Sequence, residues 1–316
     1  MLKARGPEDL LTAIPIVLGF RPTDSLVMLT FDGRHRFHAR LDLPGPEEDT
    51  DLDDLAETLL APCRTHAVGR VVFAFFTADA GLAARVALPL TRSFAAAGVG
   101  VHAVLRAHDG CWARVPLEAS GSEDEPVPYD EACHPFAVQA IFAGRVTRGS
   151  RDELRASLDP VPEQQRRVEA RQRTLRPPTA AERSWVLDLL NRCMVRRAEP
   201  DEGERARLLR AIGDVDVRDA ALFAVTRDTA PEHVRIWAAV LRSAPERDVA
   251  EAAAVTAFCA WQAGDGALAW CALDRCLAAE PGHRLGTCIA ECLARAVPPS
   301  TWEEAGRRPD VESGSA

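Results

Sequence analysis

The chain has 316 residues, a formal net charge of −9 and 47% hydrophobic residues, a composition typical of a soluble globular protein with enough length for two domains. Lys3 is the only lysine, so the chain has no phosphate-binding Gly-Lys-Ser/Thr loop and no internal lysine for a Schiff base. The acidic balance argues against nucleic acid as a partner, because affinity for phosphates depends on Lys and Arg.

The cysteine and hydropathy patterns predict a reduced, non-membrane protein. The chain has 9 cysteines without a Cys-x-x-Cys pair, and no apolar run has the length needed to cross a bilayer. We therefore expect free thiols and a cytoplasmic location. Three pairs of potential metal ligands are close in sequence: Cys63 with His66, Cys133 with His134, and Cys288 with Cys292. None has zinc-site spacing, so we expect no metal and no cofactor, and buried apolar thiols at positions 288 and 292.

The stretch at residues 10–31 carries the best candidate site. An apolar segment is followed by a polar knot containing Arg21, Asp24 and Ser25, and then by an apolar strand. In one interpretation these side chains line a ligand pocket in which Arg21 grips a small anion. In the other, Asp24 and Ser25 satisfy the amides of a turn while Arg21 pairs with Asp24.

Apolar runs and turn signals predict the strands of the first half. Strands are expected at residues 26–31, 36–43, 71–76, 99–107 and 111–117. Asp32-Gly33 is a strong hairpin signal between the first two strands, and the second alternates polar with apolar residues, as a strand near a sheet edge does. The run at 71–76 is apolar throughout, which is typical of a strand covered on both faces.

Helices are expected between these strands. Thr50 with Asp53 resembles a capping arrangement, and Asp79 is positioned to cap a helix that continues to residue 97. Strands separated by single helices favour parallel pairing with right-handed crossovers. The sequence thus predicts an α/β domain at residues 1–147 with a mixed five-stranded sheet and flanking helices, in which the acidic, Pro-rich residues 118–131 form a loop.

The second half shows helical spacing alone. Residues 148–178 predict a charged helical linker, residues 179–300 an all-helical domain, and residues 301–316 a disordered tail. Thr229 and Glu232 are expected to form a capping box. The helices of this domain are expected at residues 180–197, 202–212, 217–227, 230–243, 247–263, 265–279 and 282–296.

One helix pair resembles a known repeat. The residues WQAGDGALAWCALDRCLAAEP at positions 261–281 have the Gly-Asp turn, the small Ala269, the large Leu273 and the closing Pro of the second half of a tetratricopeptide repeat. The resemblance implies stacked helix pairs that bury faces neither helix could bury alone. We therefore expect tetratricopeptide-like packing without a regular array.

A wider resemblance covers three blocks in order. These are LLTAIPIVLGFRPTDSLVMLTFDG near the start, EHVRIWAAVLRSAP at residues 232–245, and AFCAWQAGDGALAWCALDRCLAAEPGH at residues 257–283. They are similar to an uncharacterised actinobacterial family of unknown function, and the preference for Arg over Lys fits a high-GC genome. The resemblance implies family membership and carries over no activity and no catalytic residues.

Two further features are candidate contact surfaces. Trp237, Trp261 and Trp270 occur on successive expected helices, where core packing explains most of them and any exposed one would anchor a partner. Residues 166–176 hold five arginines and one glutamate. We interpret this strip as a solvated helix face in preference to a phosphate-binding surface.

No complete catalytic constellation is present. Ser25 lacks the Gly-x-Ser-x-Gly turn of a hydrolase, although His38 or His102 could in principle approach it. Cys133 and His134 follow an acidic loop, which disfavours a thiolate. We expect a non-catalytic module that binds a protein partner through the helical domain or senses a small anion. The alternative is an enzyme of unknown type with its active site at the polar knot.

Overall fold

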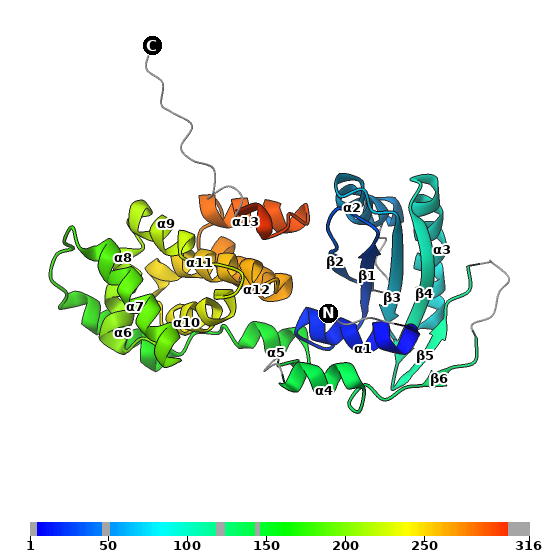
Figure 1. Ribbon diagram of the computed structural model, residues 1–316, viewed down its shortest axis with the longest axis horizontal. Coiled ribbons are helices and arrows are strands. Elements are labelled where there is room, and N and C mark those ends of the chain that lie inside the picture. The colour runs from blue at the N-terminus through cyan, green and yellow to red at the C-terminus, as the bar shows by residue number, and fades with distance from the viewer. Residues whose placement is uncertain (1–4, 46–50, 118–123, 143–145, 303–316) are drawn as a thin grey trace, which may run out of the picture. The chain divides into compact units, whose positions relative to one another are not determined.

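The computed structural model describes residues 5–45, 51–117, 124–142 and 146–302. The chain divides into two compact units, Met1–Arg151 and Asp152–Ala316 (Figure 1). Most of the tail predicted at residues 301–316 lies outside the described residues. Within the part of the chain that the structure describes, no helix combines the length and the apolarity needed to cross a membrane.

The first unit contains a six-stranded sheet in the order β2-β1-β3-β4-β5-β6. Its strands are β1 (Ser25–Phe31), β2 (His38–Asp42), β3 (Arg70–Phe76), β4 (Gly100–His108), β5 (Cys111–Arg114) and β6 (Val127–Pro128). Strands β3 and β4 are parallel and the other neighbours antiparallel, so the predicted mixed sheet is confirmed. The predicted number of five strands is wrong, because two residues of the expected loop pair with β5 and are too few to show a strand pattern.

Helices cover both faces of this sheet (Figure 1). They are α1 (Pro7–Leu18), α2 (Leu52–Thr65), α3 (Ala80–Ala96) and α4 (Pro135–Phe142), which packs against α1. Phe73 and Phe75 of β3 pack with α2 and α3, and Phe73 meets Phe94 edge to face at 5.0 Å between ring centroids. Val72, between them, points to the opposite face, where α1 lies. The prediction that this strand is buried on both faces is confirmed.

Aspartate side chains cap α2 and α3 of the first unit as acceptors. Asp79 accepts from the amide of Leu82 at 2.8 Å, which confirms the predicted cap of α3. The cap of α2 is Asp51, which accepts from the amide of Asp53 at 2.9 Å. Thr50, the residue predicted for this role, lies outside the described residues.

The second unit is helical throughout its described residues. Its helices, with α5 at the border, are α5 (Arg151–Ala156), α6 (Pro162–Arg173), α7 (Glu182–Arg196), α8 (Glu202–Ala211), α9 (Val215–Phe223), α10 (Ala230–Arg242), the 3₁₀ turn η1 (Glu246–Asp248), α11 (Val249–Gln262), α12 (Gly266–Ala279) and α13 (Arg284–Ala294). Helix α11 packs against α9, α10, α12 and α13 and is buried from Ala252 to Gln262. Its many alanines let these neighbours approach closely, because small side chains leave room for the facing helices.

One predicted cap in this unit is wrong. Thr229 does not cap α10 through Glu232, because its hydroxyl bonds to the hydroxyl of Thr226 at 2.9 Å. A complete capping box forms at α8, where Asp201 and Glu204 each bond the other's backbone amide, at 2.8 and 2.9 Å. An Asp cap differs from the Ser or Thr of the usual pattern but supplies the same oxygen acceptor.

Candidate functional site

The polar knot after α1 does not bring Arg21 and Asp24 together. The side chain of Arg21 is 57% exposed, and its Nε donates to Oε1 of Glu131 at 3.0 Å. Asp24 has a φ of 42° and accepts from the hydroxyl of Thr77 at 3.3 Å. Neither residue lines the groove described below.

Ser25 is fully buried, and its hydroxyl is hydrogen-bonded to Arg40. Its Oγ donates to the carbonyl of Thr23 at 2.6 Å and accepts from Nη2 and Nε of Arg40 at 2.7 and 3.0 Å. Arg40 also pairs with Asp42 at 2.5 Å. One donated and two accepted bonds use the full capacity of a hydroxyl, so Ser25 has no free position for a ligand.

The structure does not bring a histidine to Ser25. Ser25 is paired with Phe76 at the end of β3. His102 lies level with the step from Val71 to Val72, about 13 Å or more back along the same strand. His38 is likewise at the opposite end of β2 from the residue that pairs with Ser25. The hydrolase arrangement considered from the sequence is therefore not assembled.

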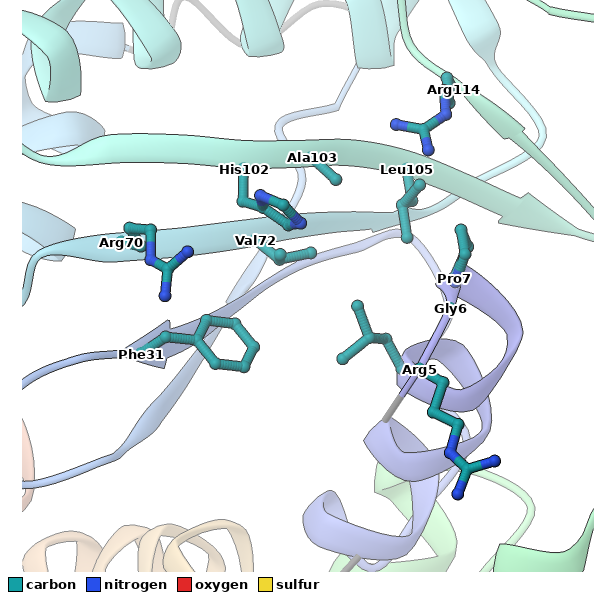
Figure 2. Close-up of a pocket in the computed structure, with 11 residues that line it drawn as sticks. Arg5, Gly6, Pro7, Phe31, Arg70, Val72, His102, Ala103, Leu105 and Arg114 are labelled. Carbon is teal, nitrogen blue, oxygen red and sulfur yellow. The ribbon is translucent and has the colours of Figure 1, made fainter. Parts of the chain in front are cut away.

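A groove of about 390 Å³ opens on the face of the sheet opposite α2 and α3, beside the start of α1 (Figure 2). This volume is within the range of small-molecule sites in proteins. Cationic and apolar side chains line it, and no acidic residue from the described part of the chain is among them. The lining residues are Arg5, Gly6, Pro7, Leu10, Phe31, Arg70, Val72, His102, Ala103, Leu105 and Arg114.

Alternation along the strands supplies an apolar floor for the groove. Val72 of β3 and Leu105 of β4 are buried and point away from the core that α2 and α3 share with the sheet. Phe31 lies at one end, as the last residue of β1 (Figure 2). Leu10 of α1 adds an apolar wall. The floor can therefore cover the apolar body of a ligand.

His102 enters the groove because β4 contains a β-bulge. The register of β4 on β3 shifts between Val71 and Val72, and this shift leaves His102 without a paired residue on β3. Both His102 and Ala103 consequently line the groove, although they are adjacent in sequence. In a regular strand only one of two adjacent side chains would face this side.

The side chains of Arg5, His102 and Arg114 line the groove without a hydrogen-bond or ion-pair partner among the described residues. Arg70 is bonded to Asp32, and this bond holds the pKa of the Asp32 carboxyl below its usual value. The guanidinium of Arg5 is directed away from the floor (Figure 2). Arg114 and His102 are thus the donors available to a ligand.

Asp9 fixes the start of α1 beside the groove. Its Oδ2 accepts from the backbone amide of Arg5 at 2.5 Å, and its Oδ1 lies 2.9 Å from Nε2 of His134, which precedes α4. The Arg5 amide, and to a smaller extent His134, keeps the pKa of Asp9 below its usual value. These bonds hold in place the wall that α1 contributes.

The three tryptophans considered as partner contacts differ in exposure. Trp237 is 0% exposed, and Trp261 is buried and donates from Nε1 to the carbonyl of Val297 at 3.0 Å. Trp270 on α12 is 37% exposed. Of the three, only Trp270 is in a position to contact a partner without displacing a helix.

The cysteines near potential metal ligands are all free thiols. Among the described residues, no group of three or more His, Cys, Asp or Glu side chains is arranged so that it could hold a metal ion. The prediction of buried thiols on α13 is wrong, because Cys288 is exposed and Cys292 is half-buried. Only Gly286 and Ile289 of this helix are buried, so the rest of its apolar stripe is left partly uncovered.

The arginine strip of α6 is compensated by nearby carboxylates. Arg166 and Arg167 pair with Glu163 at 2.5 and 3.0 Å, and Arg173 pairs with Glu169 at 3.2 Å. All these side chains are exposed or half-exposed, so the pairs contribute little to stability. This arrangement is that of a solvated helix face.

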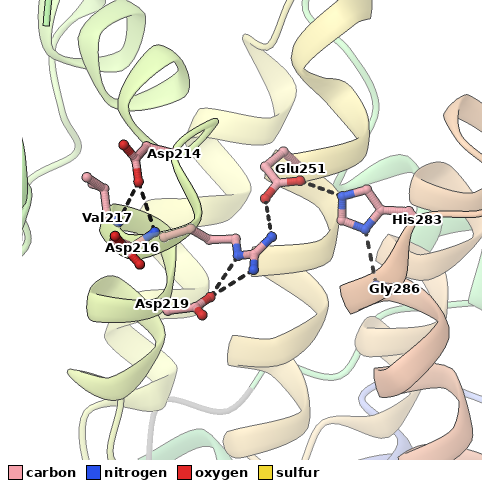
Figure 3. Close-up of polar contacts among 8 residues, drawn as sticks. Asp214, Asp216, Val217, Asp219, Glu251, His283 and Gly286 are labelled. Atoms are coloured by element: carbon pink, nitrogen blue, oxygen red, sulfur yellow. Dashed lines mark hydrogen bonds and ion pairs between the residues drawn. The ribbon is translucent and has the colours of Figure 1, made fainter.

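A second polar cluster joins α9, α11 and α13 (Figure 3). Arg218 donates to Oε1 of Glu251 at 2.8 Å, and Oε2 of Glu251 lies 2.5 Å from Nε2 of the buried His283. Hydrogen bonding to Cys276 and to Glu251 raises the pKa of His283 to about 10. The cluster ties three helices together and is built from groups that satisfy one another.

Comparison with known proteins identifies the family of the chain. No curated protein and no solved structure matches it. Residues 7–300 match the family model described as "Domain of unknown function (DUF4192)". Because this match covers nearly the whole sequence, the chain belongs to the DUF4192 family.

Proposed function

We propose that this chain is a cytoplasmic, non-catalytic module that binds a small organic anion in the groove of its first unit. The observation that supports this function most is that Arg114 and His102, which have no partner among the described residues, line the same groove as an apolar floor. This site replaces the polar knot at Arg21 as the leading location, because Arg21 and Ser25 already have protein partners.

The chemistry of the lining selects the ligand class. A guanidinium offers N–H donors in a fork that matches a carboxylate, sulfonate or phosphate. Among the residues that the structure describes, no acidic side chain lines the groove to compete for Arg114. Val72 and Leu105 cover an apolar body, and Phe31 offers an aromatic surface at one end. The expected ligand is an amphiphilic anion with an acid group near Arg114.

The lining favours binding over catalysis. The side chains that the structure places around the groove include no hydroxyl, thiol or carboxylate. Covalent catalysis needs such a nucleophile, and acid–base catalysis by His102 would have no second group to orient the imidazole.

A protein partner is proposed for the helical unit. The half-exposed Trp270 on α12 supports this role, because exposed indoles are frequent anchors of protein interfaces. The close packing of α11 on α12 around the Gly-Asp turn is consistent with a tetratricopeptide-like pair. The test is capture of one specific partner by the full chain that Trp270→Ala abolishes.

The anion-binding function is tested with 8-anilinonaphthalene-1-sulfonate, which combines an acid group with an apolar ring system. We expect Arg114→Gln to weaken binding of this probe about tenfold or more, as measured by its fluorescence, because a charge-assisted hydrogen bond is lost. The matched control is Arg85→Gln, an exposed arginine on α3, on the other side of the sheet. Equal affinity in the two variants would refute the proposed site.

A further inference from the structure

The bulge in β4 changes which side chains face the groove without changing those in the core. Val101 before the bulge and Val104 after it both pack with the core shared with α2 and α3. His102 and Ala103 between them both line the groove. Without His102, the remaining three residues would have the regular alternation of a strand. The extra residue therefore adds one side chain to the groove and none to the core.

The position of the bulge is unusual for a purely structural feature. Bulges are rare in parallel pairs, and they interrupt the backbone hydrogen bonds of the ladder. β5 pairs with β4 from Leu105 to His108, beyond the bulge, so the pairing with β5 does not depend on the shifted register. Bulges are frequent beside binding sites, where they redirect a side chain. The groove is the described feature that uses the extra residue.

We infer that His102 is the residue with which the groove recognises a second acceptor on its ligand. This inference rests on the anion-binding function proposed above. Figure 2 shows the imidazole between Arg70 and Arg114, next to Val72. A ligand whose acid group contacts Arg114 lays its apolar body on the floor and brings a second oxygen group to His102. The ligand class is an organic anion with two acid groups on one apolar framework.

The test compares two probes on the full chain by isothermal titration calorimetry. Naphthalene-1-sulfonate carries one acid group, and naphthalene-1,5-disulfonate carries two on the same rings. We expect the wild type to bind the disulfonate about tenfold more tightly. His102→Ala, and separately deletion of His102, are expected to abolish this preference. His102→Gln keeps a side-chain N–H and is expected to restore part of it. The deletion is expected to leave the melting temperature within a few degrees of the wild type.

The outcomes separate this inference from the proposed function. If His102→Ala retains the preference for the disulfonate, the inference is wrong, whether or not the deletion variant folds. If Arg114→Gln weakens both probes while His102→Ala and the deletion of His102 behave as the wild type, the groove binds anions and only the role of His102 fails. If Arg114→Gln changes neither affinity, the proposed function fails as well.

Discussion

The Nε2 atom of His283 lies 2.5 Å from a carboxylate oxygen of Glu251 and so joins the start of α13 to the central helix α11. Because Cys276 and Glu251 raise the pKa of His283 to about 10, the imidazole is charged at neutral pH. The amide of Gly286 lies 3.2 Å from Nδ1 and can donate to that atom only after the proton has left. Deprotonation therefore exchanges an ion pair for a helix cap.

Stability is expected to fall between pH 7 and pH 10. A pKa that is raised from 6.5 in the folded state gives stability that is fully present below pH 6.5 and is lost as the pH rises through about 10. Glu251→Gln is expected to lower the free energy of unfolding by roughly 2–4 kcal/mol at pH 7, because His283 and Arg218 lose their carboxylate. Urea unfolding at several pH values measures both effects. The free energy of unfolding is expected to depend less on pH in Glu251→Gln than in the wild type. Equal pH dependence in the two proteins would contradict the prediction.

Gly286 is expected to reject any side chain. A Cβ at this position would lie 2.8 Å from Sγ of Cys276. We expect Gly286→Ala to destabilise the protein by about 1–3 kcal/mol through overpacking. Adding Cys276→Ala in a double-mutant cycle is expected to recover much of this loss. The control is Gly282→Ala, where a Cβ would meet nothing within 4 Å. Urea unfolding at pH 6, where His283 is fully protonated in the folded state, measures the stability of each variant, and a coupling energy near zero would disprove the clash.

Asp201 is expected to stabilise the helical unit as the cap of α8. Asp201→Ala removes the acceptor of the Glu204 amide and leaves that donor without its partner. The expected loss is about 1 kcal/mol in the free energy of unfolding. Asp228→Ala changes an exposed aspartate that caps no helix, and we expect it to be neutral. Thermal or urea unfolding compares the two, and equal effects would rule out the cap.

Replacing the buried Trp237 and the half-exposed Trp270 is expected to change the stability of the protein by different amounts. Trp237→Ala is expected to destabilise the protein by about 3–5 kcal/mol, because a large side chain that is 0% exposed leaves a cavity. Trp270→Ala is expected to lower stability by less than about 1 kcal/mol, since its indole is 37% exposed. Iodide quenching of tryptophan fluorescence provides an independent measurement. The quenchable part of the signal is expected to decrease in Trp270→Ala and to stay unchanged in Trp237→Ala.

Local pattern was enough to predict most elements. The apolar run of β3, the hairpin at Asp32-Gly33 and the helices of the second half each depend on residues close in sequence, and the structure contains them all. β6 was missed because its pairing depends on Trp112 and Cys111, which lie far away along the chain. Thr229 failed as a cap because its hydroxyl had a nearer partner in Thr226.

The groove was not predictable in the same way. It combines residues of β1, β3, β4, β5 and α1, which come together only through the register of the sheet. One trace of it exists in the sequence. Val101 and Val104 both belong to the core side but stand three positions apart, whereas alternation requires an even separation. A single odd interval between valines also occurs in loops and helices, so it identifies a bulge only when both strands are known.

The proline that ends β6 also affects how the protein behaves at high concentration. Among the described residues, the sheet terminates at Val127–Pro128, a border of two residues, and proline has no N–H to offer to an incoming strand. A second molecule that approaches this border finds too few donors to extend the ladder. Val127 and Pro128, which form the sixth strand, thus disfavour self-association and amyloid-like growth from this side of the sheet.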